Sequence, residues 1–132
     1  MVTTACLKYW AYNDIDEITE KLYRHFKDNF FLEIQYHNTD IQKKINKRII
    51  DLHDKFGIKL ILGCDSHYIY PDQYKERDNY LEARGIIYDE DEQGWYMDYP
   101  DEQEARRRLK EQGILTDEQI DECIKNTDIL LD

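Results

Sequence analysis

Short apolar runs alternate along the chain with segments whose apolar residues recur at helical spacing. The apolar runs lie at 2–6, 30–35 and 58–63, and each has the length and the β-branched or aromatic content of a strand. The two intervals at 14–26 and 40–56 carry apolar side chains every three or four residues, which predicts helices. The order strand, helix, strand, helix, strand predicts a parallel sheet covered by helices.

Residues that favour helix ends bound these two helical segments. Asn13 or Asp14 is expected to cap the first helix, and Thr39 or Asp40 the second. Gly57 follows the second helix where a left-handed glycine commonly ends one. The helix boundaries are therefore predicted from local chemistry as well as from periodicity.

The chain beyond the third strand is predicted to be mostly helical. Thr116 and Gln119 form a capping box that opens the last of these helices. The expected elements are a helix at 71–84, an acidic loop at 89–94, a strand-like stretch at 95–97, a charged helix at 101–112 and a helix from 117 toward 131. We divide one predicted domain, residues 1–132, into a βαβαβα core at 1–87 and an appendage at 88–132 with a short β element and helices.

Composition and charge narrow the classes of function. A chain of 132 residues is long enough for one hydrophobic core, and no apolar stretch approaches the roughly 18 residues of a membrane span. The net charge is −11 and the isoelectric point is near 4.7, whereas affinity for nucleic acid comes mainly from lysine and arginine. We expect no membrane partner and no direct binding of nucleic acid by this chain. If nucleic acid is involved, another part of a larger protein would have to bind it.

The cysteines indicate a reducing compartment. Cys6, Cys64 and Cys123 form an odd set at wide spacings, and no signal-peptide pattern is present. We expect free thiols and a cytoplasmic protein. No glycine-rich phosphate loop and no G-x-S-x-G motif is present, so no catalytic residue is assigned.

The most informative local feature is Asp65-x-His67, directly beyond the third predicted strand. Alternate residues that leave a strand point to the same side, and ligands of parallel α/β folds gather at the carboxyl ends of strands. Cys6 ends the first predicted strand, and sulfur, nitrogen and oxygen donors together suit zinc or another divalent metal. The competing interpretation is a turn aspartate, a partly buried histidine and a small buried cysteine.

Two further groups of residues have competing interpretations. Glu33 and His37 flank the end of the second predicted strand and could approach the same rim, or could serve only local hydrogen bonds. Arg106, Arg107 and Arg108 could bind phosphate. The acidic stretch that precedes them favours ion pairs on a solvated helix face instead.

Four ordered stretches resemble successive landmarks of the PHP domain (polymerase and histidinol phosphatase type) in the alpha subunit of bacterial DNA polymerase III. They are VTTACL, FFLEIQYHN, GCDSHYIYPDQY and WYMDYPDEQ. The terminal ECIKNTDILLD is also similar to a helix with an Asn-Thr pair near the end of that domain. The resemblance therefore covers nearly the whole chain.

The resemblance implies a distorted barrel of parallel strands and helices, of which this chain would be the C-terminal part. It also implies a cluster of metal ions at one rim, in which Cys6, Asp65 and His67 match family ligands while Glu33 and His37 lie near the site. The family's first ligand motif, H-x-H, and several later ligands are not in the sequence. We therefore expect a partial metal site and no catalysis by this chain alone.

The function implied by the resemblance is a role in DNA replication. The chain would supply scaffold and a partial metal site to a DNA-directed DNA polymerase, a nucleotidyltransferase of bacterial or phage origin, with the remainder of the alpha subunit as its partner. One alternative is a stand-alone acidic binding or inhibitor protein from a mobile element, motivated by the charge of −11. Another is a metal-dependent phosphoesterase completed as a homodimer.

Overall fold

The computed structural model describes residues 1–5, 10, 14–86 and 94–131. Within these residues three strands, β1 (Val2–Thr3), β2 (Phe30–Ile34) and β3 (Leu60–Leu62), form one parallel sheet in the order β1-β2-β3. Leu32 of β2 pairs with Leu60 of β3. The predicted α/β class and parallel strands are confirmed. A closed barrel would need strands beyond these three and stays a prediction.

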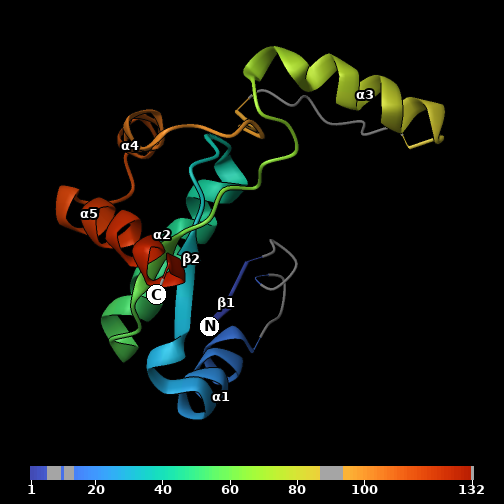
Figure 1. Cartoon of the computed structure of the whole chain (residues 1–132). Helices are drawn as coiled ribbons and strands as arrows, with labels where there is room; N and C mark the ends of the chain where they lie inside the picture. The colour runs from blue at the N-terminus through green and yellow to red at the C-terminus, as the bar shows by residue number, and fades with distance from the viewer. Residues whose placement is uncertain (6–9, 11–13, 87–93, 132) are drawn as a thin grey trace.

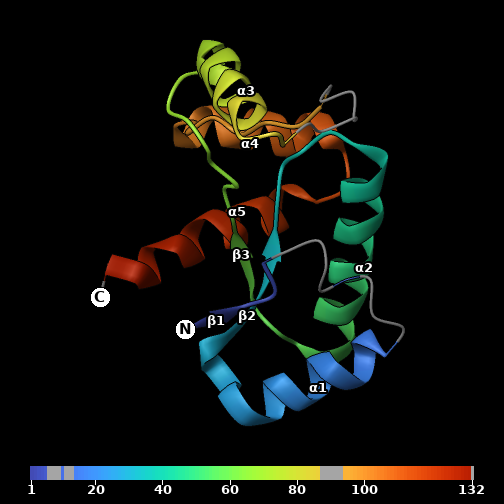
Figure 2. The same ribbon diagram turned by 90° about the vertical axis from the view of Figure 1, so that its right-hand side faces the viewer.

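Two helices connect the strands. These are α1 (Ile15–Phe26) and α2 (Asp40–Phe56), and Asp16 of α1 accepts a 2.9 Å hydrogen bond from Lys55 of α2. This contact joins the first turn of α1 to the last turn of α2. Figure 2 shows α2 and α5 (Asp117–Lys125) on opposite sides of the strands, so helices enclose the sheet from both directions.

The second strand forms the centre of the core. Four of its five residues are buried and only Glu33 is partly exposed, as expected for an apolar strand with a neighbour on each edge. The core residues come from β2, α2, β3, α4 (Glu102–Gln112) and α5, and include Phe30, Leu32, Ile34, Ile49, Leu52, Leu60, Leu109, Ile120 and Cys123. The core therefore joins the predicted appendage to the predicted βαβ unit.

Helix ends follow the predicted local chemistry at most positions. The Thr39 hydroxyl accepts a hydrogen bond from the Gln42 N–H, and Gly57 ends α2 with a φ of 67°. Thr116 and Gln119 form the reciprocal capping box of α5. Asp14 occupies the capping position of α1, but its side chain makes no capping hydrogen bond.

The strands are shorter than predicted, most clearly at β1. The apolar run continued to residue 6, but the strand ends at Thr3. Ala5 has a φ of 31°, which a strand does not allow. In addition, the Glu33 N–H donates to the Thr4 hydroxyl, so a side chain takes the place of a backbone ladder partner.

The remaining chain is mostly helical, as predicted. Figure 1 shows α3 (Tyr74–Ala83) standing away from the rest of the molecule, and none of its residues is buried. The remaining helical elements are η2 (Lys27–Asn29), η3 (Pro71–Gln73), α3 (Tyr74–Ala83), α4 (Glu102–Gln112) and η4 (Asn126–Leu131). No helix in the described part of the chain is long and apolar enough to cross a membrane.

The predicted short strand at 95–97 is absent, which corrects the expected β element of the appendage. The segment has no regular structure. Its neighbour Gly94 accepts a hydrogen bond from the Asn38 N–H, whereas Met97 accepts one from the His67 N–H. Since these partners lie on two different loops, the segment bridges them instead of pairing with one strand.

The outer edge of β3 is closed by side chains from the C-terminal helices. The Leu60 N–H donates to the Glu122 carboxylate at 2.9 Å, and the Leu60 carbonyl accepts from the Asn126 amide at 2.7 Å. Both backbone groups would otherwise face outward without a strand partner. Asn126 belongs to the Asn-Thr pair on which the resemblance of the terminal segment rests. In the structure its side chain binds the edge of β3.

Replacing Asn126 by alanine is expected to destabilise the fold by about 1–2 kcal/mol, because the Leu60 carbonyl loses its partner. Lys125→Ala is the matched control, since Lys125 is an exposed neighbour at the same helix end. Urea denaturation of both variants measures the difference. Equal stability of the two would mean that water replaces the Asn126 amide at no cost.

Candidate functional site

Asp65 and His67 lie together beyond the carboxyl end of β3. His67 Nε2 is 3.3 Å from Asp65 Oδ1, and each side chain is about half exposed. Two ligands at about 2.0–2.1 Å from a tetrahedral zinc ion lie about 3.3 Å from each other. The separation therefore fits two ligands of one metal ion, and it also suits an ion pair between a carboxylate and a protonated imidazole.

Two donors alone do not make a metal centre. In residues 1–5, 10, 14–86 and 94–131, no group of three or more His, Cys, Asp or Glu side chains could hold a metal ion. Cys6, the third predicted ligand, lies outside the described residues. Carboxylate and imidazole donors are those that zinc accepts, so the residues present fit one part of a metal site.

Glu33 is held between the first and third strands. Its carboxylate accepts hydrogen bonds from the Thr3 hydroxyl at 2.7 Å and from the Gln35 amide at 3.1 Å. Glu33 and Gln35 therefore lie on the same side of the strand, as the alternation of side chains along a strand requires. A Cβ atom on Gly63 would lie 2.0 Å from Glu33 Oε1, so only glycine at 63 leaves room for this side chain.

Replacing Gly63 by alanine should displace Glu33 and cost about 1–3 kcal/mol of stability, because the whole outer part of the Glu33 side chain would overlap the new methyl group. Thermal unfolding of Gly63→Ala, alone and combined with Glu33→Ala, measures the effect. The overlap predicts that the second substitution relieves most of the loss caused by the first. Independent, additive losses would contradict it.

His37 is fully buried near the Asp65–His67 pair. Its Nδ1 atom accepts a 3.0 Å hydrogen bond from the Tyr96 N–H, so the neutral ring carries its proton on Nε2. Burial lowers the pKa of His37 to about 4, with the charges of Asp65, Arg108 and His67 as weaker influences. His37 therefore lies near the candidate site as a neutral side chain whose acceptor nitrogen is already engaged.

The described arginines of α4 divide into two classes. Arg106 pairs with Glu102, and Arg107 with Glu104 and Glu111, in the exposed ion pairs predicted from the spacing. Arg108 is different, because its side chain is only 5% exposed and pairs with the buried carboxylate of Asp98. The prediction of a solvated helix face is therefore wrong for Arg108.

Sequence reasoning missed the pair of Arg108 and Asp98, although a signal was available. Ala105, Arg108, Leu109 and Gln112 are the buried residues of α4, at the i, i+3, i+4, i+7 spacing of a core-facing stripe. An arginine on such a stripe needs a buried partner. The periodicity alone could have placed Arg108 inside, but could not have identified Asp98 as its partner.

The acidic residues before and within α4 do not form a free acidic face in the described part of the chain. Asp98 pairs with Arg108, and Asp101 accepts a hydrogen bond from the Glu104 N–H as the helix cap. Glu102 pairs with Arg106. Hydrogen bonds from Arg107, and then from Arg108, hold the pKa of Glu104 at about 2. The alternative of an acidic inhibitor stays a prediction, because the acidic residues at 89–92 lie outside the described residues.

Comparison with known proteins identifies polymerase relatives. The chain is 34% identical over 77 residues to the DNA polymerase III subunit alpha of Aquifex aeolicus, a match to 52% of this chain and 7% of that protein. It is 27% identical over 107 residues to the same subunit of Thermus aquaticus, covering 76% of this chain and 8% of the relative. The probable DNA polymerase YorL of Bacillus subtilis is 30% identical over 114 residues, with the same coverage.

These matches are homologues at modest identity, and they relate the chain to a segment of DNA polymerase III alpha subunits. The chain spans less than a tenth of the length of these relatives. No protein-family model matches the chain. The similarity to the polymerase subunit predicted from the sequence is therefore confirmed, whereas the PHP domain and its metal site stay predictions.

Proposed function

We propose that this chain is part of the PHP domain of a replicative polymerase of the DNA polymerase III alpha type, where it contributes scaffold and part of a metal site. The observation that carries the proposal is the Asp65–His67 pair, 3.3 Å apart, in a chain homologous to DNA polymerase III alpha subunits. Its partner would be the remainder of such a subunit. The chain would not polymerise DNA alone.

The order of the strands supports this assignment. Because β1 and β3 both run parallel to β2, residues that leave their carboxyl ends emerge at the same end of the sheet. Cys6 follows β1 closely in sequence, as Asp65 follows β3. We assign Cys6 as the third ligand on this basis and on the resemblance of VTTACL to the family motif.

The ligands would hold zinc or another divalent metal ion, with further ligands from the remainder of the polymerase. A divalent cation in such a site acts as a Lewis acid toward phosphate oxygens. Asp65 would supply the negative charge that attracts the cation, and His67 a neutral nitrogen donor. His37, with its Nδ1 engaged by the Tyr96 N–H, would remain outside the set of ligands.

Metal binding tests the site directly. Equilibrium dialysis of the 132-residue chain against Zn²⁺ or Co²⁺, followed by elemental analysis, should find about one ion per chain. Asp65→Asn, His67→Gln and Cys6→Ser should each weaken binding by at least tenfold, on the scale by which even supporting residues affect metal affinity. His25→Gln is the matched control, since His25 is exposed on α1.

Two results would refute the site. One is a folded wild-type chain that retains no metal at micromolar concentrations, and the other is a His67→Gln variant that binds as tightly as His25→Gln. The DNA that flanks the coding segment tests membership in the polymerase separately. An H-x-H motif upstream and in frame would support it, and flanking DNA without polymerase sequence would count against it.

A further inference from the structure

The segment 94–98 joins the loop after β2 to the loop after β3. At its first end, the Gly94 carbonyl accepts a 2.7 Å hydrogen bond from the Asn38 N–H. The Tyr96 N–H donates to His37 Nδ1 at 3.0 Å, and the Trp95 ring lies 4.8 Å from the His37 ring. The segment is therefore attached to the end of β2 by two hydrogen bonds and a ring contact.

At its other end, the segment holds the loop that carries Asp65 and His67. The Met97 carbonyl accepts hydrogen bonds from the N–H groups of His67 at 2.7 Å and Tyr68 at 3.3 Å. The Ser66 hydroxyl donates to the Asp98 carbonyl at 2.9 Å. Because three consecutive residues, one of them His67 itself, bind this short segment, its position sets the position of the loop.

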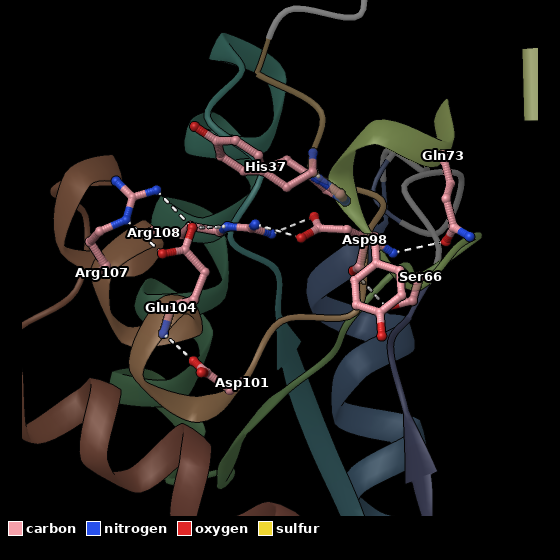
Figure 3. A network of polar contacts seen from close by, with 10 residues as sticks. His37, Ser66, Gln73, Asp98, Asp101, Glu104, Arg107 and Arg108 are labelled. Carbon is pink, nitrogen blue, oxygen red and sulfur yellow. Dashed lines mark hydrogen bonds and ion pairs between the residues drawn. The ribbon is translucent and has the colours of Figure 1, made fainter. Parts of the chain in front are cut away.

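Arg108 fixes the segment to helix α4. Its Nη1 and Nη2 nitrogens each donate a 2.7 Å hydrogen bond to the Asp98 carboxylate, and its Nε donates to Glu104 at 2.8 Å. Figure 3 shows the side chain extended between these two carboxylates. The guanidinium also lies 4.5 Å from the centre of the Tyr96 ring and 5.2 Å from that of Tyr36.

These contacts require an arginine in particular. A guanidinium binds a carboxylate through two parallel N–H groups and stacks on aromatic rings, whereas a lysine ammonium offers a single point of charge. The pair of Asp98 and Arg108 is almost completely buried, with side chains 7% and 5% exposed. A geometry fixed by two short bonds and excluded from water is suited to holding a neighbouring loop in one position.

We propose that Arg108 is a positioning residue for the Asp65–His67 pair. It acts through Asp98 and the 94–98 segment, and through them sets the distance between the two candidate ligands. The inference rests on the proposed function, since it gives Arg108 a part in metal binding without contact to the metal. It differs from a purely structural role because it predicts a specific effect on the loop at 65–68.

The test is Arg108→Lys in the 132-residue chain, which keeps the charge and removes the two parallel bonds. Amide hydrogen exchange at His67 and Tyr68 should accelerate at least tenfold, because the Met97 carbonyl that holds both N–H groups becomes mobile. Affinity for Co²⁺ should fall at least fivefold, with a changed d–d absorption spectrum. Arg106→Lys is the control and should change both quantities less than twofold, because Arg106 pairs with Glu102 and Asp121, neither of which binds Arg108.

A folded Arg108→Lys variant with unchanged exchange at His67 and unchanged Co²⁺ affinity would overturn the inference. If that variant does not fold by circular dichroism, Ser66→Ala replaces it, since it removes only the hydrogen bond from the loop to the Asp98 carbonyl. Ser66→Ala should weaken Co²⁺ binding two- to fivefold, and unchanged binding and exchange would count against the inference. A wild-type chain that binds no Co²⁺ refutes the proposed function. In that case the difference in amide exchange at His67 between wild type and Arg108→Lys is the remaining test of the positioning role.

Discussion

Replacing Arg108 by methionine is expected to lower the free energy of unfolding by about 3–5 kcal/mol, because it leaves the buried Asp98 carboxylate without its partner. In a domain of this size the melting temperature should fall by about 10 °C or more. Urea denaturation at pH 7 measures the change. Few single substitutions in this chain should have a larger effect.

Two comparisons separate the cost of the unpaired charge from the loss of packing. Arg107→Met removes an arginine from exposed ion pairs of the same helix and should cost less than about 1 kcal/mol. The double variant Asp98→Leu, Arg108→Met removes both charges and should be more stable than Arg108→Met alone. A double variant at least as unstable as the single one would show that packing, and not an unpaired charge, is the cause.

Acidification should destabilise the chain between about pH 6.5 and pH 4 through His37. The pKa of His37 is about 4 in the folded chain, against 6.5 without its surroundings. Between these values the unfolded chain binds a proton that the folded chain does not, so stability is complete above pH 6.5 and is lost as the pH falls toward 4. The loss amounts to as much as about 3 kcal/mol, since each pKa unit corresponds to 1.36 kcal/mol.

Urea denaturation at several pH values measures this loss, and His37→Asn is the control. Asparagine cannot titrate, and it can place an acceptor near the position of Nδ1 to receive the Tyr96 N–H. Glu104, whose pKa is lowered from 4.5 to about 2, loses its contribution as the pH falls from about 4.5 to 2, so the interval between pH 6.5 and 4.5 reports on His37. A wild-type slope between pH 6.5 and 4.5 that persists unchanged in His37→Asn would assign the loss to other groups.

The elements that rest on local chemistry were predictable from the sequence. The apolar run at 30–35 became a buried central strand, Thr39 and Thr116 capped the starts of their helices, and Gly57 ended α2, as expected. Each of these predictions depends on residues within a few positions of one another. The adjacency of Asp65 and His67 was predictable for the same reason, since alternate residues after a strand lie on one side.

Contacts between distant segments were not predictable in this way. Residues 95–97 were predicted as a strand from their apolar character, yet they bind two separate loops, and periodicity carries no information about such partners. The burial of Arg108 depends on its ion pair with Asp98, which lies in a segment without regular structure. Cys6, the predicted third ligand, lies outside the described residues.

The closed edge of β3 also constrains the order in which the segments of the chain can fold. Glu122 and Asn126, which bind Leu60, come from positions more than sixty residues later in the chain. During synthesis on the ribosome, the edge of β3 at Leu60 therefore stays open until residue 126 has emerged. An open edge of an apolar strand is a template for pairing with another chain. Once Glu122 of α5 and Asn126 of η4 bind Leu60, its backbone N–H and carbonyl groups are no longer available to another chain.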